Sequence, residues 1–414
     1  MIPRLTGLLT AAVLAFPGLA QGIEIQEVTS PGGIEAWLVQ DESIPFVAID
    51  IWFDGGASLD PEGARGATHL MTGLLEEGAG NMNAREFAER VEGLAASFEF
   101  DVYRDALTVS AQMLTENRDA AAQLLRAALV EPRFDEDAIE RVRGQVLSII
   151  EGDARDPDEI ASDTFNSLAW GDHPYGSALE GTRESVSALT REHIVAAHDA
   201  VLARDRVIVG AAGDISAEDL GLLLDEVLGD LPAEGAPMPE LADYQLGGGT
   251  TVVEFPSPQS VAVFGHEGIE RDDEEFFPAF VLNQILGGGN FRSRLMQEVR
   301  VERGLTYGVY TFLGTSEYGQ TVGGRFSSSN DLVAEAKRYL TGAYPLRFDG
   351  NGRIAGILAG MQADGMPVNY INTRNDRVEA VTQEDVRRVA ERLLQPEELH
   401  FVVVGQPEGL DPTN

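Results

Sequence analysis

Cysteine is absent from this sequence of 414 residues, and positive charge is scarce. Without cysteine the chain forms no disulfide bond and has no thiol chemistry, so its stability must come from core packing. Lys337 is the only lysine among 30 basic residues, which stand against 68 acidic ones, and the formal net charge is −38. Such acidity disfavours nucleic acids and other polyanions as partners. We interpret the carboxylates first as solvated surface.

Long hydrophobic runs are also missing after the first twenty residues, so we expect no membrane span in the mature chain. The N-terminus has Arg4, an apolar run over Leu5–Phe16, and the small residues Gly18 and Ala20. This order is typical of a secretory signal peptide that is cleaved near Ala20. We therefore expect residues 1–20 to be removed and the mature protein to be periplasmic or secreted.

One pattern occurs in both halves of the chain. Thr190 is followed by Gly213 after 23 residues, and Thr382 is followed by Gly405 after 23 residues. In both cases the threonine precedes a helical pattern, a short turn and an apolar strand that ends at the glycine. Threonine is a favourable N-cap residue, so each copy predicts a capped helix followed by a strand.

The starts of the two halves match more loosely. Residues 46–75 and residues 260–289 each give a strand, an acidic loop and a helix. We therefore expect two homologous domains in tandem, one at 21–231 and one at 250–414. Residues 232–249 are rich in proline, glycine and alanine, and we predict that they link the two domains.

The pattern within the first domain indicates its layers. Residues 97–114 alternate between apolar and polar side chains, as paired antiparallel strands do. Helical patterns follow at 117–129, 135–151 and 158–169. Strands grouped with runs of helices are typical of the α+β class, so we predict two tandem α/β sandwich domains of this class.

A candidate metal site begins at His69. Offsets of three and four residues share one face of a helix, and a zinc protease has glutamate and histidine at these offsets. Here they are Thr72 and Gly73. A neutral hydroxyl is no general base near neutral pH, and glycine offers no ligand. A single histidine on a helix is most simply a packed or hydrogen-bonded residue.

An alternative metal site stays open on the same segment. Glu76 is seven residues after His69, on the same face of the expected helix, and Glu151 belongs to a later helix. Two carboxylates and one imidazole are enough to bind a metal ion. The spacing does not require this arrangement.

A second candidate site lies in the C-terminal half. Residues 292–303 predict a helix with Gly304 as its C-cap, and a strand follows from Leu305. Arg300 in the last helical turn and Tyr307 near the start of the strand can converge across this corner. A guanidinium and a phenol both donate hydrogen bonds to a peptide carbonyl or a developing oxyanion. Alternatively, Arg300 interacts with the helix dipole and Tyr307 packs on the sheet.

Several segments together resemble the pitrilysin-like or insulinase-like M16 zinc metallopeptidases. The chain is most similar to subfamily M16B, in the two-chain form of the bacterial peptidases and of mitochondrial processing peptidase. The resemblance covers nearly the whole mature chain, and it implies one half of a clam-shell with LuxS/M16 metallohydrolase-like domains. It rests on GARGATHLMTGLLEEGAG (63–80), ARDP (154–157), GDHPYG (171–176), LTREHI (189–194), GGGNFRSRLMQEVRVERGLTYGVY (287–310) and VTQEDV (381–386).

The zinc site implied by this resemblance is degenerate. His69 matches the first histidine of the family's His-x-x-Glu-His motif, but Thr72 and Gly73 stand where the glutamate and the second histidine belong. When the chain is aligned on the ARDP turn, the family's distal glutamate ligand falls on Ser148 or Ile149. The resemblance thus implies a metal-free, non-catalytic subunit, with no cofactor on this chain and zinc in a catalytic partner.

The substrate-binding pair implied by the resemblance is kept. The family holds the substrate backbone at the zinc site with an arginine and a tyrosine seven residues apart, which match Arg300 and Tyr307. In two-chain members the metal-free subunit retains this pair. The resemblance therefore implies a heterodimer with a catalytic M16B subunit that hydrolyses peptides. This chain would contribute no catalytic residue, but it would supply chamber wall and a clamp for the substrate carbonyl.

Two other functions remain open for the sequence. Some members of the family serve as structural core subunits, so the chain could be a non-enzymatic scaffold that binds peptides. A self-sufficient hydrolase would instead need His69, Glu76 and Glu151 to hold a metal. Zinc content of the isolated chain distinguishes this last function from the others.

Overall fold

The computed structural model describes residues 24–61, 63–256, 260–288, 292–302, 308–326, 351–395, 397–405 and 413. The predicted signal peptide and Tyr307 lie outside these ranges. Among the described residues, no helix has both the length and the apolar character that a membrane crossing demands.

The N-terminal domain is built on a six-stranded sheet with the order β1-β2-β8-β3-β7-β6. Strand β2 pairs parallel to β8, and every other neighbouring pair is antiparallel. The predicted strands in 97–114 are confirmed as the β6–β7 hairpin. The strands are β1 (Gln26–Thr29), β2 (Glu35–Gln40), β3 (Phe46–Asp54), β6 (Ser97–Val102), β7 (Ala106–Leu114) and β8 (Val207–Gly213).

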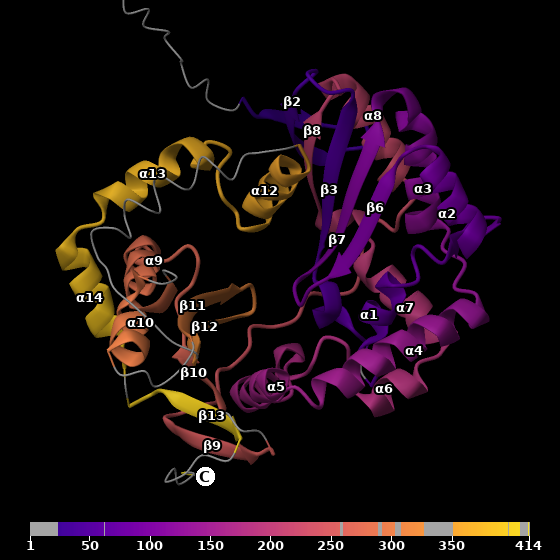
Figure 1. Ribbon diagram of the computed structural model, residues 1–414. Helices are drawn as coiled ribbons and strands as arrows, with labels where there is room; N and C mark the ends of the chain where they lie inside the picture. Colours follow the sequence, from indigo (N-terminus) through magenta and orange to yellow (C-terminus); the bar gives the residue numbers. More distant parts are fainter. Residues whose placement is uncertain are drawn as a thin grey trace, which may run out of the picture.

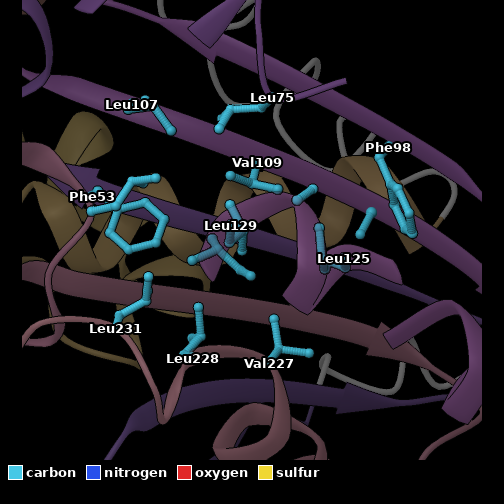
Figure 2. Packing of buried hydrophobic residues seen from close by; sticks show 14 of the residues in the cluster. Phe53, Leu75, Phe98, Leu107, Val109, Leu125, Leu129, Val227, Leu228 and Leu231 are labelled. Carbon is cyan, nitrogen blue, oxygen red and sulfur yellow. The ribbon is translucent and has the colours of Figure 1, made fainter. Parts of the chain in front are cut away.

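Helices cover this sheet and its ends, and the three predicted at 117–129, 135–151 and 158–169 are present as α3, α4 and α5. Figure 2 shows the main core, where Leu125 and Leu129 of α3 and Val227 of α8 pack near β7. The α-helices are α1 (Ala67–Thr72), α2 (Ala84–Gly93), α3 (Arg118–Val130), α4 (Glu136–Asp153), α5 (Pro157–Trp170), α6 (Arg183–Ala188), α7 (Arg191–Val201) and α8 (Ala217–Leu228). The short elements are η1 (Gly56–Leu59), β4 (Gly78–Ala79), β5 (Met82–Asn83), η2 (Thr115–Asn117), η3 (Pro174–Gly176) and η4 (Arg204–Arg206).

The C-terminal domain has a five-stranded sheet with the order β11-β12-β10-β13-β9. Helices α9 and α14 pack together on one face of this sheet. The strands are β9 (Gly249–Glu254), β10 (Val261–Glu267), β11 (Val309–Ser316), β12 (Gly319–Phe326) and β13 (His400–Gly405). The helical elements are α9 (Phe276–Asn283), η5 (Gln284–Gly288), α10 (Arg294–Met296), η7 (Gln297–Val301), α12 (Asn351–Ala363), α13 (Tyr370–Ala380) and α14 (Gln383–Leu393).

The two sheets share one topology, which confirms the predicted tandem α+β architecture. The order β2-β8-β3-β7-β6 corresponds to β9-β13-β10-β12-β11, and the first pair is parallel in both sheets. The predicted helix caps are also present. The backbone N–H of Thr190 donates to Nδ1 of His193 at 3.1 Å, and that of Thr382 donates to Asp385 at 2.8 Å. Residues 229–248, which include most of the predicted linker, form neither helix nor strand.

Each domain covers part of the other domain's sheet. Helix α5 packs on β10 and β13, whereas α12 packs on β3 and β8. Figure 1 shows the resulting closed arrangement, in which α12 lies against the N-terminal sheet and α13 leads back toward α9 and α14. The approach of α12 is close, because a Cβ on Gly210 would lie 2.2 Å from the carbonyl oxygen of Ala355. Glycine is therefore required at position 210.

The GDHPYG segment joins the domains at a single tyrosine. The hydroxyl of Tyr175 donates to Oδ1 of Asp105 at 2.6 Å and accepts the backbone N–H of Tyr318 at 3.0 Å. Asp105 lies in the β6–β7 turn, and its Oδ2 accepts the N–H of Glu317 at 3.2 Å. The Trp170 ring packs edge-on against Tyr175, with 5.9 Å between ring centroids. A segment that the resemblance identified is thus part of the domain junction.

Candidate functional site

The helix that carries His69 begins at a buried carboxylate. Asp60 accepts the backbone N–H groups of Gly66 and Thr68, each at 2.7 Å, and thereby caps the N-terminus of α1. Arg65 lies 3.3 Å from the same carboxylate and also donates to the Pro174 carbonyl at 3.1 Å. These contacts fix the DPEGARGATH segment against the GDHPYG loop. The position of His69 is therefore well defined by the fold.

His69 itself retains one feature of a metal ligand. Its Nδ1 is buried and has no hydrogen-bond partner among the described residues. Burial lowers the pKa of the imidazole, and the charges of Glu180 and Asp60 oppose this shift. A neutral imidazole with a free nitrogen is the form that binds a metal. One such nitrogen does not make a zinc site, which takes at least three protein ligands.

The positions that should supply the general base and the second ligand carry neither group, and both are tightly packed. Thr72 is 4% exposed, and its Oγ1 donates to the carbonyl oxygen of Thr68 at 2.8 Å. At Gly73 an added Cβ would lie 3.0 Å from Cγ1 of Val142 on α4, so α4 packs where a side chain would begin. Ser148, further along α4, is exposed and carries no carboxylate. The residues at the family's zinc positions therefore do not fit zinc.

The alternative set of His69, Glu76 and Glu151 gains no support from the geometry. Helix α1 ends at Thr72, and Glu76 follows in a non-helical turn, so it does not continue the helical face of His69. Glu151 is exposed on α4 and forms ion pairs with Arg155 and Arg183. Among the described residues, no three histidine, aspartate or glutamate side chains are grouped to hold a metal ion.

The predicted substrate-binding pair is only partly within the described structure. Arg300 is half-buried in η7, which continues directly from α10. The predicted helix over 292–303 thus appears as a short α-helix followed by a π-helical turn. Tyr307 lies outside the described residues, and β11 begins at Val309, close to the predicted strand start. The convergence of Arg300 and Tyr307 stays a prediction.

A cavity of about 800 Å³ between the two domains was not anticipated from the sequence. Its wall includes the end of β3, the β6–β7 turn, the loop before α9, the β11–β12 turn and the loop between α12 and α13. Acidic residues outnumber basic ones in it: Asp54, Asp105, Glu270, Asp272, Asp273, Glu274, Glu317 and Asp364 face Arg271 and Arg377. The run ERDDEE at 270–275 is a visible signal, but the other carboxylates come from distant segments.

The fold brings several carboxylates together in this cavity, and their burial and mutual repulsion raise the pKa of two of them. Burial raises the pKa of Asp54 to about 6, and the charges of Glu317 and Asp105 add to the effect, whereas Arg206 opposes it. Burial and the charge of Asp105 also raise the pKa of Glu317. Trp52, Phe276, Phe277 and Tyr370 give the same wall apolar surface. The cavity therefore combines negative charge with aromatic rings.

Comparisons with known proteins agree with these features. A family model described as insulinase (peptidase family M16) matches residues 36–183, and a model described as peptidase M16 inactive domain matches residues 188–338. A non-peptidase homolog of Helicobacter pylori is 24% identical over 96% of this chain and 98% of its own length. An uncharacterized zinc protease of Mycobacterium leprae is 25% identical over 91% and 90%, respectively.

A solved structure has the same fold along almost the whole chain. A crystal structure of a peptidase M16 inactive domain from Pseudomonas fluorescens has a TM-score of 0.86 and 26% sequence identity, and covers 94% of this chain and 100% of that one. The matched region spans both sheets. From the two family models, the relatives and this shared fold, we conclude that the chain belongs to the M16 peptidase family and consists of two M16 domains in tandem.

Proposed function

We propose that this chain is the non-catalytic, metal-free subunit of a heterodimeric M16B-type zinc peptidase. It forms one half of a clam-shell, and a separate catalytic M16 chain forms the other half and carries the zinc. This chain supplies chamber wall and the Arg300–Tyr307 clamp for the substrate carbonyl, and the partner hydrolyses the peptide.

The observation that carries this proposal is the degenerate zinc position. Thr72 already donates to the Thr68 carbonyl, and Val142 packs against Gly73. The chain therefore keeps His69 of the zinc motif but has neither the base nor the remaining ligands. A family member with this pattern needs a second chain for zinc-dependent chemistry. The cavity between the domains supports a peptide-facing inner wall.

The test uses the purified mature chain and a candidate catalytic M16 chain from the same organism. Zinc content and cleavage of a fluorogenic peptide library are measured for each chain alone and for the mixture. We expect this chain to be zinc-free and inactive alone, and to raise the activity of the catalytic chain at one-to-one stoichiometry. A matched control replaces the partner by its variant without the zinc-motif glutamate, which must abolish activity in the mixture.

Two outcomes of this test contradict the proposal. Stoichiometric zinc and activity in the isolated chain would assign a self-sufficient hydrolase around His69. Absence of any activity with the partner, together with a stable homodimer, would favour a non-enzymatic scaffold; the Helicobacter pylori relative is itself named a non-peptidase homolog.

The proposed location is the periplasm or the exterior of the cell. Residues 1–20 have the charge, apolar run and small residues of a signal peptide. Cell fractionation followed by N-terminal sequencing of the mature chain tests this location. We expect a new N-terminus close to Gln21, and a cytoplasmic protein that begins at Met1 would contradict it.

A further inference from the structure

We propose that a second cavity, between α5 and the C-terminal sheet, binds a carboxylate group through Arg104 and Arg325. The cavity has a volume of about 260 Å³. Its wall comes from the β6–β7 turn, α5 and strands β10–β12, so both domains contribute to it. Apart from Ser316, its lining residues differ from those of the central cavity. The proposal concerns this chain alone and does not depend on the catalytic partner.

The charge of the lining is opposite to that of the chain. Among the described residues that line this cavity, Arg104 and Arg325 are the charged ones, and none is a carboxylate. Across the whole sequence, 68 acidic residues stand against 30 basic ones. A locally cationic cavity in such a chain concentrates anions that the rest of the surface repels.

Arg104 is a half-buried cation in this cavity. Its Nη1 donates to the carbonyl oxygen of Tyr175, and the centre of its guanidinium lies 5.8 Å from the Tyr175 ring centroid. Among the described residues, the structure places no carboxylate within ion-pair distance of it. Burial lowers the pKa of Arg104, although the charges of Asp163 and Asp105 act in the opposite direction. Among the described residues, the one hydrogen bond of this half-buried guanidinium goes to the Tyr175 carbonyl, so other N–H groups can donate to an external anion.

Arg325 lines the same cavity from β12. It donates to Oδ1 of Asp158 at 3.3 Å and to Oγ of Ser162, both on α5. Asp158 balances its charge, and these bonds hold its side chain across the gap between sheet and helix. Of the two arginines, Arg104 is thus the one that has no carboxylate within ion-pair distance among the described residues, and Arg325 adds a second, positioned donor.

The aromatic part of the lining determines what kind of group can lie next to the bound carboxylate. A Cβ on Gly319 would lie 2.7 Å from the Trp170 ring, and a Cβ on Gly323 would lie 2.8 Å from the Phe312 ring. Because the two glycines have no side chain, these aromatic rings can lie directly against the strands that line the cavity. Phe165 adds a further apolar wall. A carboxylate next to an apolar side chain fits this combination.

The volume of the cavity and the net charge of the chain further restrict which ligands can bind. The volume is smaller than the roughly 300–1,000 Å³ of typical drug-sized pockets, so it suits the end of a chain. A guanidinium binds a planar carboxylate by two parallel hydrogen bonds. The chain's large negative charge disfavours a dianion such as phosphate. We therefore assign the cavity to the C-terminal carboxylate of a peptide with an apolar last residue, and an acidic side chain is the other source of the same group.

The test measures binding to the full mature chain by titration calorimetry. The probes are acetyl-Ala-Phe with a free carboxylate, the same peptide as its C-terminal amide, acetyl-Glu-Phe-amide and inorganic phosphate. We expect the free acid to bind at one site per chain, the amide to bind at least tenfold more weakly, and phosphate not to compete. Acetyl-Glu-Phe-amide distinguishes the two sources, because it carries only a side-chain carboxylate.

Variants connect the binding to the two arginines. We expect Arg104→Met to weaken binding of the free acid at least tenfold and Arg325→Gln to weaken it several-fold. Arg85→Met is the matched control, since Arg85 is 85% exposed on α2 and its loss should leave binding unchanged. Arg325→Gln also keeps the test valid if Arg104→Met disturbs the contact with Tyr175. Equal binding of acid and amide, tighter binding of phosphate, or full affinity in both variants would overturn the proposal.

Discussion

Tyr175 and Asp105 form a 2.6 Å hydrogen bond at the point where the two domains meet. The same hydroxyl accepts the N–H of Tyr318, so one phenol connects the GDHPYG loop, the β6–β7 turn and the β11–β12 turn. Tyr175 is 2% exposed, and burial together with the charge of Asp105 raises the pKa of its hydroxyl. Since Asp105 lines the central cavity and Tyr175 lines the smaller one, this contact fixes the geometry of both.

Removing the Tyr175 hydroxyl should therefore lower stability. Tyr175→Phe keeps the ring but leaves Asp105 and the N–H of Tyr318 without their partner. A buried polar group without a partner costs about 1–3 kcal/mol, so we expect a loss of that size in the free energy of unfolding. Urea denaturation measures it. Tyr103→Phe, at a residue 58% exposed in the same region, is the matched control and should change stability by less than about 0.5 kcal/mol.

The raised pKa of Asp54 predicts a pH-dependent stability difference. The folded-state pKa is about 6, above the reference value of 3.8. Its favourable contribution is therefore fully present below pH 4 and is lost as pH rises through 6. Asp54→Asn mimics the protonated carboxyl group, so this variant should gain stability relative to the wild type above pH 6.

Urea denaturation at pH 5 and pH 8 measures this difference. The ceiling of the gain is about 3 kcal/mol, and partial solvent exposure of Asp54 reduces it to about 1–2 kcal/mol. Asp101→Asn on the exposed part of β6 is the control. A wild type that is stabilised relative to Asp54→Asn at pH 8 would show that the sign of the shift is wrong.

Restoring a glutamate at the zinc motif should damage the fold. Thr72 is buried, and its hydroxyl donates to the Thr68 carbonyl. Thr72→Glu therefore places a carboxylate at a buried position where no cation among the described residues is in contact with it. We expect a loss of about 3 kcal/mol or more at pH 8, and a smaller loss at pH 5, where the carboxyl group can be protonated. Thr72→Val keeps the shape and should cost about 1 kcal/mol or less. Equal stability of the two variants at pH 8 would mean that position 72 tolerates a base.

The proposed clamp predicts a kinetic effect without a structural one. Arg300→Ala in the reconstituted heterodimer should lower turnover by about 10²–10³, the range for loss of one oxyanion donor. Assembly, measured by analytical ultracentrifugation, should not change. Arg294→Ala is the control, since Arg294 is 64% exposed and pairs with Glu298 one turn further along the chain. Normal turnover of the Arg300→Ala complex would exclude the clamp.

The departure from the zinc motif can be seen in the sequence because its signal is local. Thr72 and Gly73 follow His69 at fixed helical offsets, and the loss of two motif positions is visible without coordinates. The structure adds the reason why the loss is not compensated: α4 presents Val142 to Gly73, and α1 stops at Thr72. The predicted helical face that would have carried Glu76 does not exist, because the chain turns after six helical residues.

The sequence by itself determined the tandem α+β architecture, through the two Thr-capped helices and the apolar strands that follow them. Capping and alternation depend on residues a few positions apart, so they are readable in order along the chain. Only the tertiary structure decided that α5 covers the C-terminal sheet and α12 the N-terminal sheet. It also decided that the charge of Glu317 acts on Asp54. It also brought Arg104 and Arg325, more than two hundred residues apart in the sequence, into the lining of one cavity. These contacts arise from packing between segments that are far apart in the sequence, and no local sequence pattern encodes them.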